Sequence, residues 1–197
     1  KHLTWHDITS EAEVIGDGQL VIREPDWTSR ESRRSGPFSG PGTSRFTWEE
    51  RLDLVRQADD RYRMTMRGDV EGMWASTVDH DDVATITADE VDVLSRRGDD
   101  TQVAEDTPMR LGGDMEVDRL QAVGRVLLST PTRTADCHML DYNTRTNIAE
   151  MVARAGRTVS MLTEGASMPV HATRMIWNMD PAIDTITLQN PRGTGDR

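Results

Sequence analysis

Acidic residues between positions 79 and 90 have the spacing of a calcium-binding loop. Asp79, Asp81 and Glu90 fall at positions 1, 3 and 12 of such a loop, where carboxylates coordinate Ca²⁺ in an EF-hand. Val83 at position 5 supplies no side-chain oxygen, and Ala84 occupies position 6, where the sharp turn needs glycine. We therefore expect no bound metal, with calcium binding as the alternative that the spacing leaves open.

Nucleophilic and metal-ligating side chains are otherwise scattered. The single cysteine, Cys137, excludes an intramolecular disulfide and a multi-cysteine zinc site, and we expect it to be a small core residue. The chain contains no Gly-x-Ser-x-Gly, no phosphate-binding glycine loop and no His-Glu-x-x-His motif, so no cofactor is predicted. The five histidines form no recognised ligand spacing: His2, His6, His80, His138 and His171.

The stretch from Asp60 to Ile86 is the most informative one for function. It predicts a long helix, a break at Gly68-Asp69, a shorter helix, and an acidic pair at Asp81-Asp82 before a strand. This order resembles the start of the NTF2-like superfamily, in its SnoaL-like and ketosteroid-isomerase-like branch, over about residues 47–89. The resemblance implies a cone-shaped fold, in which a curved sheet wraps around helices and encloses an apolar pocket.

The same resemblance implies roles for two residues. Tyr62 would match the aromatic donor that stabilises a developing oxyanion, and Asp89 is the acid nearest to the expected general base. The implied reaction is of the isomerase, cyclase or dehydratase type, on a small apolar molecule; the sequence does not decide whether the chain is an enzyme. The same aromatic and methionine side chains would also suit a packed core. The apolar walls of the implied site are Met66, Met73, Trp74 and Trp177.

Helix signals come first along the chain and strand signals later, which predicts an α+β fold with a curved antiparallel sheet packed on N-terminal helices. A capping box at Thr47–Glu50 begins the first helix, and shorter helices are predicted after Asp69, over 87–97 and over 147–155. Strands are predicted over 83–87, 115–118, 125–128, 135–142, 170–177 and 183–188. The first helix rests on apolar residues that recur every three or four positions: Trp48, Leu52, Val55, Ala58, Tyr62 and Met66.

Residues 1–46 are predicted to be a flexible extension ahead of a single α+β domain over residues 47–197. Residues 13–22 predict a short hairpin around Gly16-Asp17-Gly18, because glycine supplies the positive φ of a tight turn. Residues 25–46 are rich in proline, glycine, serine and arginine, which predicts a linker or an arm that lies along another surface.

Composition narrows the functional classes. The chain has 197 residues, 36% hydrophobic and 29% charged, which argues against a membrane protein and a disordered one, so we expect a cytoplasmic location. A net charge of −11 repels phosphate backbones and argues against a nucleic-acid partner. Lys1 is the only lysine, which reflects either a GC-rich genome or adaptation to high salt.

A structural role is the alternative function. The Pro/Gly-rich arm and the lack of a catalytic constellation favour a virion or particle coat component, whose arm docks on neighbouring subunits. Residues 141–156, with Met175 to Trp177 downstream, resemble a strand–helix–strand passage of picornavirus-like jelly-roll coats. A homo-oligomer is expected, and an assembled particle is the alternative location.

Overall fold

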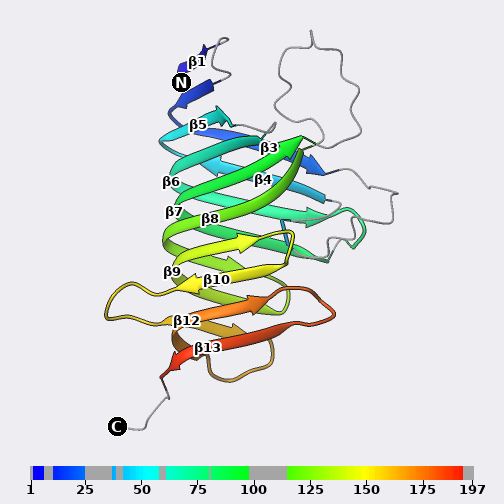
Figure 1. The fold of residues 1–197 in the computed structure, drawn as a ribbon, viewed down its shortest axis with the longest axis vertical. Helices are drawn as coiled ribbons and strands as arrows, with labels where there is room; N and C mark the ends of the chain where they lie inside the picture. The colour runs from blue at the N-terminus through cyan, green and yellow to red at the C-terminus, as the bar shows by residue number, and fades with distance from the viewer. Residues whose placement is uncertain are drawn as a thin grey trace.

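The computed structural model describes residues 2–6, 11–24, 37–38, 42–57, 61–79, 81–97 and 115–192. These residues form one antiparallel sheet of 13 strands and no helix (Figure 1). The strands are β1 (His2–His6), β2 (Glu11–Ile15), β3 (Gly18–Glu24), β4 (Gly42–Trp48), β5 (Arg51–Arg56), β6 (Arg61–Ser76), β7 (Val83–Arg97), β8 (Met115–Ser129), β9 (Arg133–Asn143), β10 (Ile148–Val152), β11 (Val159–Thr163), β12 (Val170–Asn178) and β13 (Thr185–Pro191).

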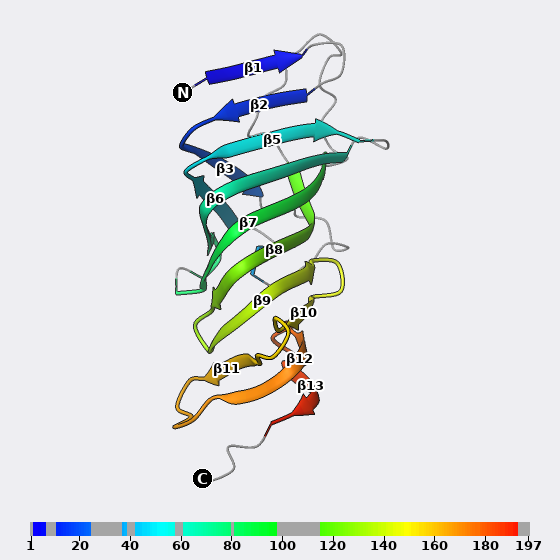
Figure 2. The same ribbon diagram turned by 90° about the vertical axis from the view of Figure 1, so that its left-hand side faces the viewer.

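The strands form a meander of ten rungs in chain order, with β1 at one end and β13 at the other (Figure 2). Three rungs consist of two strands in line: β2 with β3, β5 with β4, and β10 with β11. For example, β5 pairs with the first part of β6, up to Arg67, and β4 pairs with the last part, from Glu71. The other rungs are single strands.

Each long rung bends near its middle, so the sheet doubles over into two layers. The first layer contains β2, β5 and β10, and the second layer contains β3, β4 and β11, together with the corresponding halves of the long strands. Register shifts mark the bends at Arg67/Val70, Thr87/Glu90 and Val123/Val126. We call this line of bends the ridge and the opposite side, where hairpin loops join the rungs, the rim.

The space between the layers is an apolar core. Side chains alternate along each rung as a strand requires: Met64, Met66 and Trp74 of β6 are buried, whereas Arg63 and Met73 face outward. β3 and β8 lie four rungs apart, about 19 Å along the sheet. They nevertheless approach each other, which places their contact across the interior.

The predicted α+β class and its N-terminal helices are wrong, because the described residues from 42 to 76 form β4, β5 and β6 and the turns beside them. Leu54 is 1% exposed, whereas Val55, which belongs to the predicted helical stripe, is 37% exposed. The chain therefore buries every second residue here, as a sheet does. The cone-shaped arrangement of a sheet around helices is absent from the described residues.

The shorter predicted helices are also wrong. Residues 69–76 continue β6, and residues 87–97 belong to β7. In β10, Ala149 and Met151 are buried while Ile148 is exposed, and Asn147 has a positive φ of 54° in a turn rather than a helix cap. The strands predicted from residue 83 onward all fall in or overlap β7, β8, β9, β12 and β13.

The described part of the N-terminal segment belongs to the sheet. β2 and β3 do not pair as a hairpin; β2 pairs with β5 and β3 with β4, and Gly16, with φ of 95°, lies at the ridge between them. The expected boundary after residue 46 falls inside β4. Phe38 is buried and stacks on Phe46 with ring centroids 6.1 Å apart, whereas residues 25–36 and 39–41 lie outside the described residues. None of the described segments forms a helix that could cross a membrane.

Candidate functional site

Most arginines on the outer face of the sheet are paired with acids on neighbouring rungs. Arg63 Nε lies 2.6 Å from Asp92 Oδ2, and Arg67 bridges Asp53 and Glu90 at 2.8 Å each. Because these pairs lie at the surface and their arginines are partly exposed to solvent, each contributes at most about 1 kcal/mol and chiefly favours the correct cross-strand register. Further pairs of this kind are Arg51–Glu13, Arg96–Glu116, Arg119–Asp141 and Arg174–Glu150.

A charged triad holds three rungs together at the ridge. Arg125 Nε donates to Asp89 Oδ1 at 2.7 Å, and its Nη2 donates to Asp69 Oδ1 at 2.7 Å. Arg125 follows Gly124, and both have positive φ, 43° and 78°. A Cβ on Gly124 would lie 2.8 Å from Asp89 Cγ, so glycine permits this close approach.

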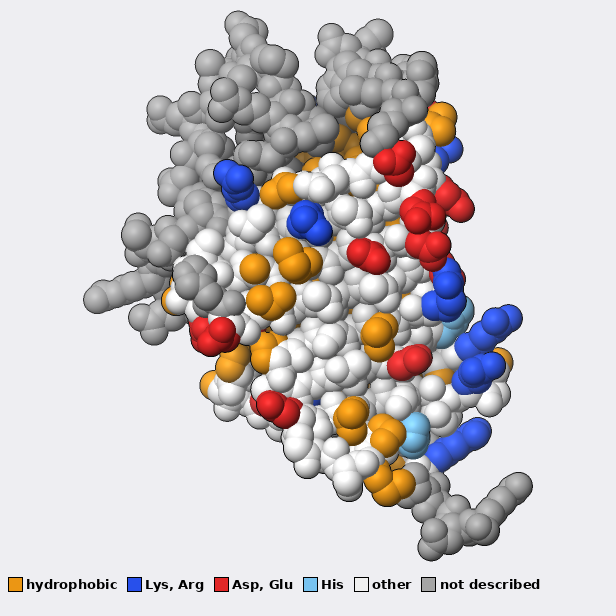
Figure 3. Space-filling view, turned by 180° about the vertical axis from the view of Figure 1, so that it is seen from behind, with side chains coloured by type: hydrophobic (Ala, Val, Ile, Leu, Met, Phe, Trp, Pro, Cys, Tyr) orange, Lys and Arg blue, Asp and Glu red, His pale blue; other side chains and the backbone are white. Residues whose placement is uncertain are grey.

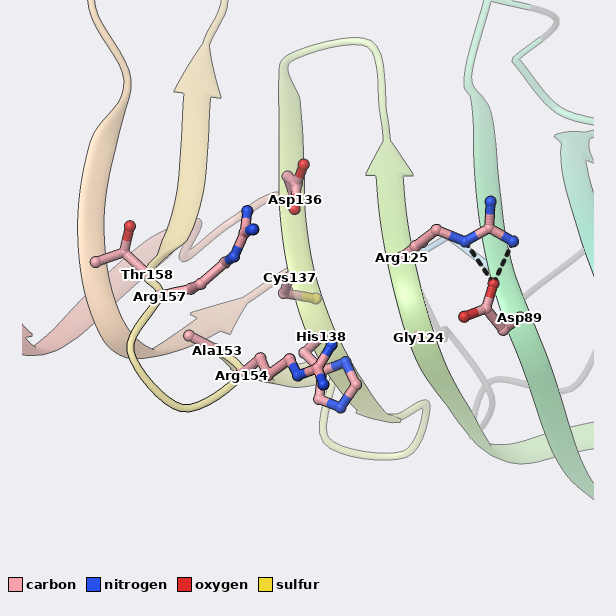
Figure 4. A pocket seen from close by; sticks show the side chains of 10 residues that line it. All are labelled: Asp89, Gly124, Arg125, Asp136, Cys137, His138, Ala153, Arg154, Arg157 and Thr158. Atoms are coloured by element: carbon pink, nitrogen blue, oxygen red, sulfur yellow. Dashed lines mark hydrogen bonds and ion pairs between the residues drawn. The ribbon is translucent and has the colours of Figure 1, made fainter.

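A pocket of about 410 Å³ opens beside the triad, between β8, β9 and the turn that joins β10 to β11 (Figure 4). The turn closes with a hydrogen bond from Arg157 N to Arg154 O at 2.9 Å, and Gly156 within it has φ of 79°. Figure 4 shows the Arg154 side chain extending toward His138. The polar side chains that line the pocket are Asp89, Arg125, Asp136, His138, Arg154, Arg157 and Thr158.

Arg154 and Arg157 differ from the arginines of the outer face. In the part of the chain that the structure describes, neither guanidinium has a carboxylate partner. Both side chains are exposed at the mouth of the pocket. This arrangement presents two cationic forks, each able to bind a carboxylate or a phosphate through two hydrogen bonds.

The charge of the ridge changes along its length. Hollows nearer the N-terminal end are lined by acids, including Glu49, Glu50 and Asp69, whereas Arg154 and Arg157 lie toward the C-terminal end. The view from behind shows acidic side chains above basic ones along one edge of the molecule (Figure 3). On the described part of the ridge, the C-terminal half is therefore the part whose side chains favour a bound anion.

The calcium-loop alternative is not realised. Residues 83–90 are extended in β7, where an EF-hand needs a loop followed by a helix. Among the described residues, no cluster of three or more histidine, cysteine, aspartate or glutamate side chains could hold a metal ion.

Cys137 lines the pocket wall but is buried, as the sequence predicted. Burial, followed by the nearby charge of Asp136, raises the pKa of its thiol to about 12. The thiol is therefore protonated at neutral pH, and since the thiolate is the nucleophilic form, the side chain does not supply a catalytic nucleophile.

The structure does not bring Tyr62 and Asp89 together. Tyr62 lies in the first layer opposite Ser95, whereas Asp89 lies at the ridge beside the Arg67–Glu90 pair. Tyr62 and Arg67 stand five positions apart on β6, a distance of about 17 Å along the strand. Asp89 is also 48% exposed and paired with Arg125, so the two side chains do not form an acid–base site.

The predicted apolar walls are likewise dispersed. Met66, Trp74 and Trp177 are buried in the interior, whereas Met73 faces outward and is 37% exposed. Trp74 lies on β6 and Trp177 on β12, five rungs or about 24 Å apart. The indole of Trp177 donates to Asp184 Oδ1 at 2.9 Å, so its polar edge is engaged within the chain.

The sequence analysis did not predict Arg125, Arg154 or Arg157 as functional residues. The one available signal was the Arg154-Ala-Gly-Arg157 spacing, a glycine turn flanked by arginines, in a segment taken for the end of a helix. Comparisons with protein-family models, curated proteins and solved structures give no match to this chain.

Proposed function

We propose that this protein is a structural building block, and that a second copy of the chain extends its sheet at each end. The single observation that carries this proposal is that both end rungs present uncharged strand edges. Proteins that stay monomeric usually protect such edges with charged residues, bulges or covering segments.

Among the described residues, no strand pairs with the outer side of β13. Within the described residues β13 pairs only with β12, and its sequence, Thr-Ile-Thr-Leu-Gln-Asn-Pro, contains no charge. Ile186 and Leu188 pack on the core but remain half-buried. The apolar interior therefore ends unfinished at this rung, and another rung would complete it.

The opposite end has a matching edge. β1 pairs only with β2 in the part of the chain that is described, from His2 opposite Ile15 to His6 opposite Glu11. Its sequence, His-Leu-Thr-Trp-His, contains no acidic residue, lysine or arginine. Such strands can pair with another chain through their backbone groups.

Strand direction favours joining β13 of one copy to β1 of the next. β13 starts beside Asn178 at the rim and runs toward the ridge, whereas β1 starts beside Ile15 near the ridge and runs toward the rim. The junction is therefore antiparallel, like every other step of the sheet, and it keeps ridge on ridge and layer on layer. In a two-fold contact between the β13 strands of two copies, the ridges of the two copies would lie on opposite sides of the joined sheet. Only one layer would then continue from one copy into the next. A head-to-tail contact that continues the sheet in one direction builds an open row of copies, whose length grows with concentration.

We expect Leu188→Lys to keep the protein monomeric, while Thr187→Lys leaves assembly intact. Leu188 faces the interior, so a following copy would bury the new ammonium group, whereas Thr187 faces outward and its lysine stays in water. Light scattering coupled to size-exclusion chromatography over a range of concentrations measures the mass, and thermal unfolding checks that both variants fold.

The wild-type mass should rise with concentration without stopping at two copies. A wild-type chain that stays monomeric, or a mass that Leu188→Lys lowers no more than Thr187→Lys does, contradicts the proposal. A dimer that does not grow contradicts head-to-tail joining and supports a two-fold contact instead.

A second candidate function is the binding of a small apolar molecule between the layers. The observation that favours it is the methionine content of the interior: Met64, Met66, Met151, Met161, Met175 and Met179 are all buried. Methionine is flexible and adapts its shape to different apolar partners, so these side chains could move aside for a guest.

We expect Met151→Leu/Met175→Leu to weaken the binding of a fluorescent fatty acid, because leucine keeps the volume but loses the flexibility. Met73 and Met139 face outward, so Met73→Leu/Met139→Leu is the matched control. Fluorescence titration measures the affinity. A wild-type protein that does not bind the probe, or equal affinity in both double variants, rejects this second function.

A further inference from the structure

The turn from Ala153 to Thr158 places two arginines on one side of the ridge pocket. Arg154 and Arg157 are the first and last residues of the hydrogen-bonded turn, and both line the pocket. The two guanidinium groups have no carboxylate partner in the described part of the chain, so both are available to an anion.

Charges of both signs line the pocket. Its walls hold three arginines and two carboxylates, and His138 adds a further nitrogen donor or acceptor. One arginine, Arg125, is already engaged with Asp69 and Asp89. Once these ion pairs are set aside, two arginines, Arg154 and Arg157, face one remaining carboxylate of the walls, Asp136.

The pocket is large enough to hold a molecule bigger than a simple ion. Its volume of about 410 Å³ falls within the range of small-molecule sites, roughly 300–1,000 Å³. The bulge of β8 at Gly124-Arg125 and the facing residue His138 of β9 belong to the wall opposite the two arginines (Figure 4). A ligand with one anionic group at the arginines would have room for the rest of its structure along this wall.

We propose that Arg154 and Arg157 bind the phosphate group of a small phosphorylated molecule. A phosphate presents several acceptor oxygens and up to two negative charges, which matches two guanidinium forks better than a single carboxylate does. His138 lines the same pocket and, in this proposal, contributes a hydrogen bond to the phosphate. The phosphate could be carried by a soluble molecule or by a lipid headgroup, and the experiment separates these two sources.

Isothermal titration calorimetry with inorganic phosphate and with glycerol phosphate tests the site, at an ionic strength of about 0.15 M to screen general charge effects. We expect wild-type protein to bind both, and Arg154→Gln/Arg157→Gln to bind at least about tenfold more weakly, because two charge-assisted hydrogen-bonding groups are lost. The control is Arg63→Gln/Arg119→Gln, which changes the net charge equally on the outer face, away from the pocket.

Co-sedimentation with vesicles identifies the source of the phosphate. Retention on phosphatidic acid vesicles, but not on phosphatidylcholine vesicles, assigns a lipid headgroup if the Arg154→Gln/Arg157→Gln variant loses it. Binding of glycerol phosphate without vesicle retention assigns a soluble ligand. No phosphate binding by wild-type protein, or the same loss in the Arg63→Gln/Arg119→Gln control, overturns the proposal. Repeating the titration with Leu188→Lys keeps this result independent of assembly.

Discussion

Replacing Leu54 with aspartate should leave the protein unfolded at room temperature, whereas the same change at Val55 should leave it folded. Leu54 is 1% exposed in the interior of the first layer, and Val55 is 37% exposed on its outer face. A buried carboxylate without a partner costs more than about 4 kcal/mol, a large part of the 5–15 kcal/mol that typically stabilises a domain. Far-UV circular dichroism and urea unfolding measure the difference.

Because Leu54 and Val55 are adjacent, the comparison of their aspartate variants distinguishes a strand from a helix at this position. Aspartate disfavours strands at both positions to a similar degree, so its intrinsic propensity cancels in the comparison. A helix with Leu52 and Val55 on its apolar face would give the opposite order, with Val55→Asp as the damaging change. Equal stability of the two variants would also contradict the register of β5.

The first half of the fold was misread because a strand can mimic a helix. In the predicted helical stripe, Tyr62 and Met66 stand four residues apart, and a spacing of four satisfies both the two-residue period of a strand and one turn of a helix. The residue that distinguishes a strand from a helix is Met64, because only a strand places it on the same face as Tyr62 and Met66. It is 1% exposed, and that observation needed the structure.

The segment over β10 shows a different cause of error. Residues 147–155 contain alanine, glutamate and methionine, which favour helix locally, behind an asparagine suited to capping. In the fold β10 lies between β9 and β12 and hydrogen-bonds to both, so tertiary pairing overrides the local preference. Local propensity gives no information about such neighbours.

The ridge could not be predicted, because its contacts join residues distant in sequence. Arg125 meets Asp89 and Asp69 across separations of 36 and 56 positions. The Gly68-Asp69 pair was interpreted as a helix end, although glycine there serves the bend of a long strand, as Gly124 does in β8. What the sequence did predict correctly is the strand-rich second half, where alternation is not confounded by a four-residue repeat.

Gly68→Ala should lower the free energy of unfolding by about 2–4 kcal/mol, through strain and overlap together. Gly68 has φ of 83°, where a residue with a Cβ is strained. A Cβ there would also lie 2.9 Å from both Cβ and N of Glu50, so backbone atoms of the neighbouring rung would have to move. Urea unfolding of purified protein gives the magnitude.

Gly156→Ala separates the two contributions. Gly156 has a similar φ of 79°, but no heavy atom lies within 4 Å of an added Cβ, so only the conformational cost of about 1–2 kcal/mol applies. The excess loss at Gly68 then measures how tightly β4, β5 and β6 meet at the ridge. If both alanine variants lose the same stability, the bend at Gly68 has room to relax, and the close contact of these rungs is not a constraint on the folded sheet.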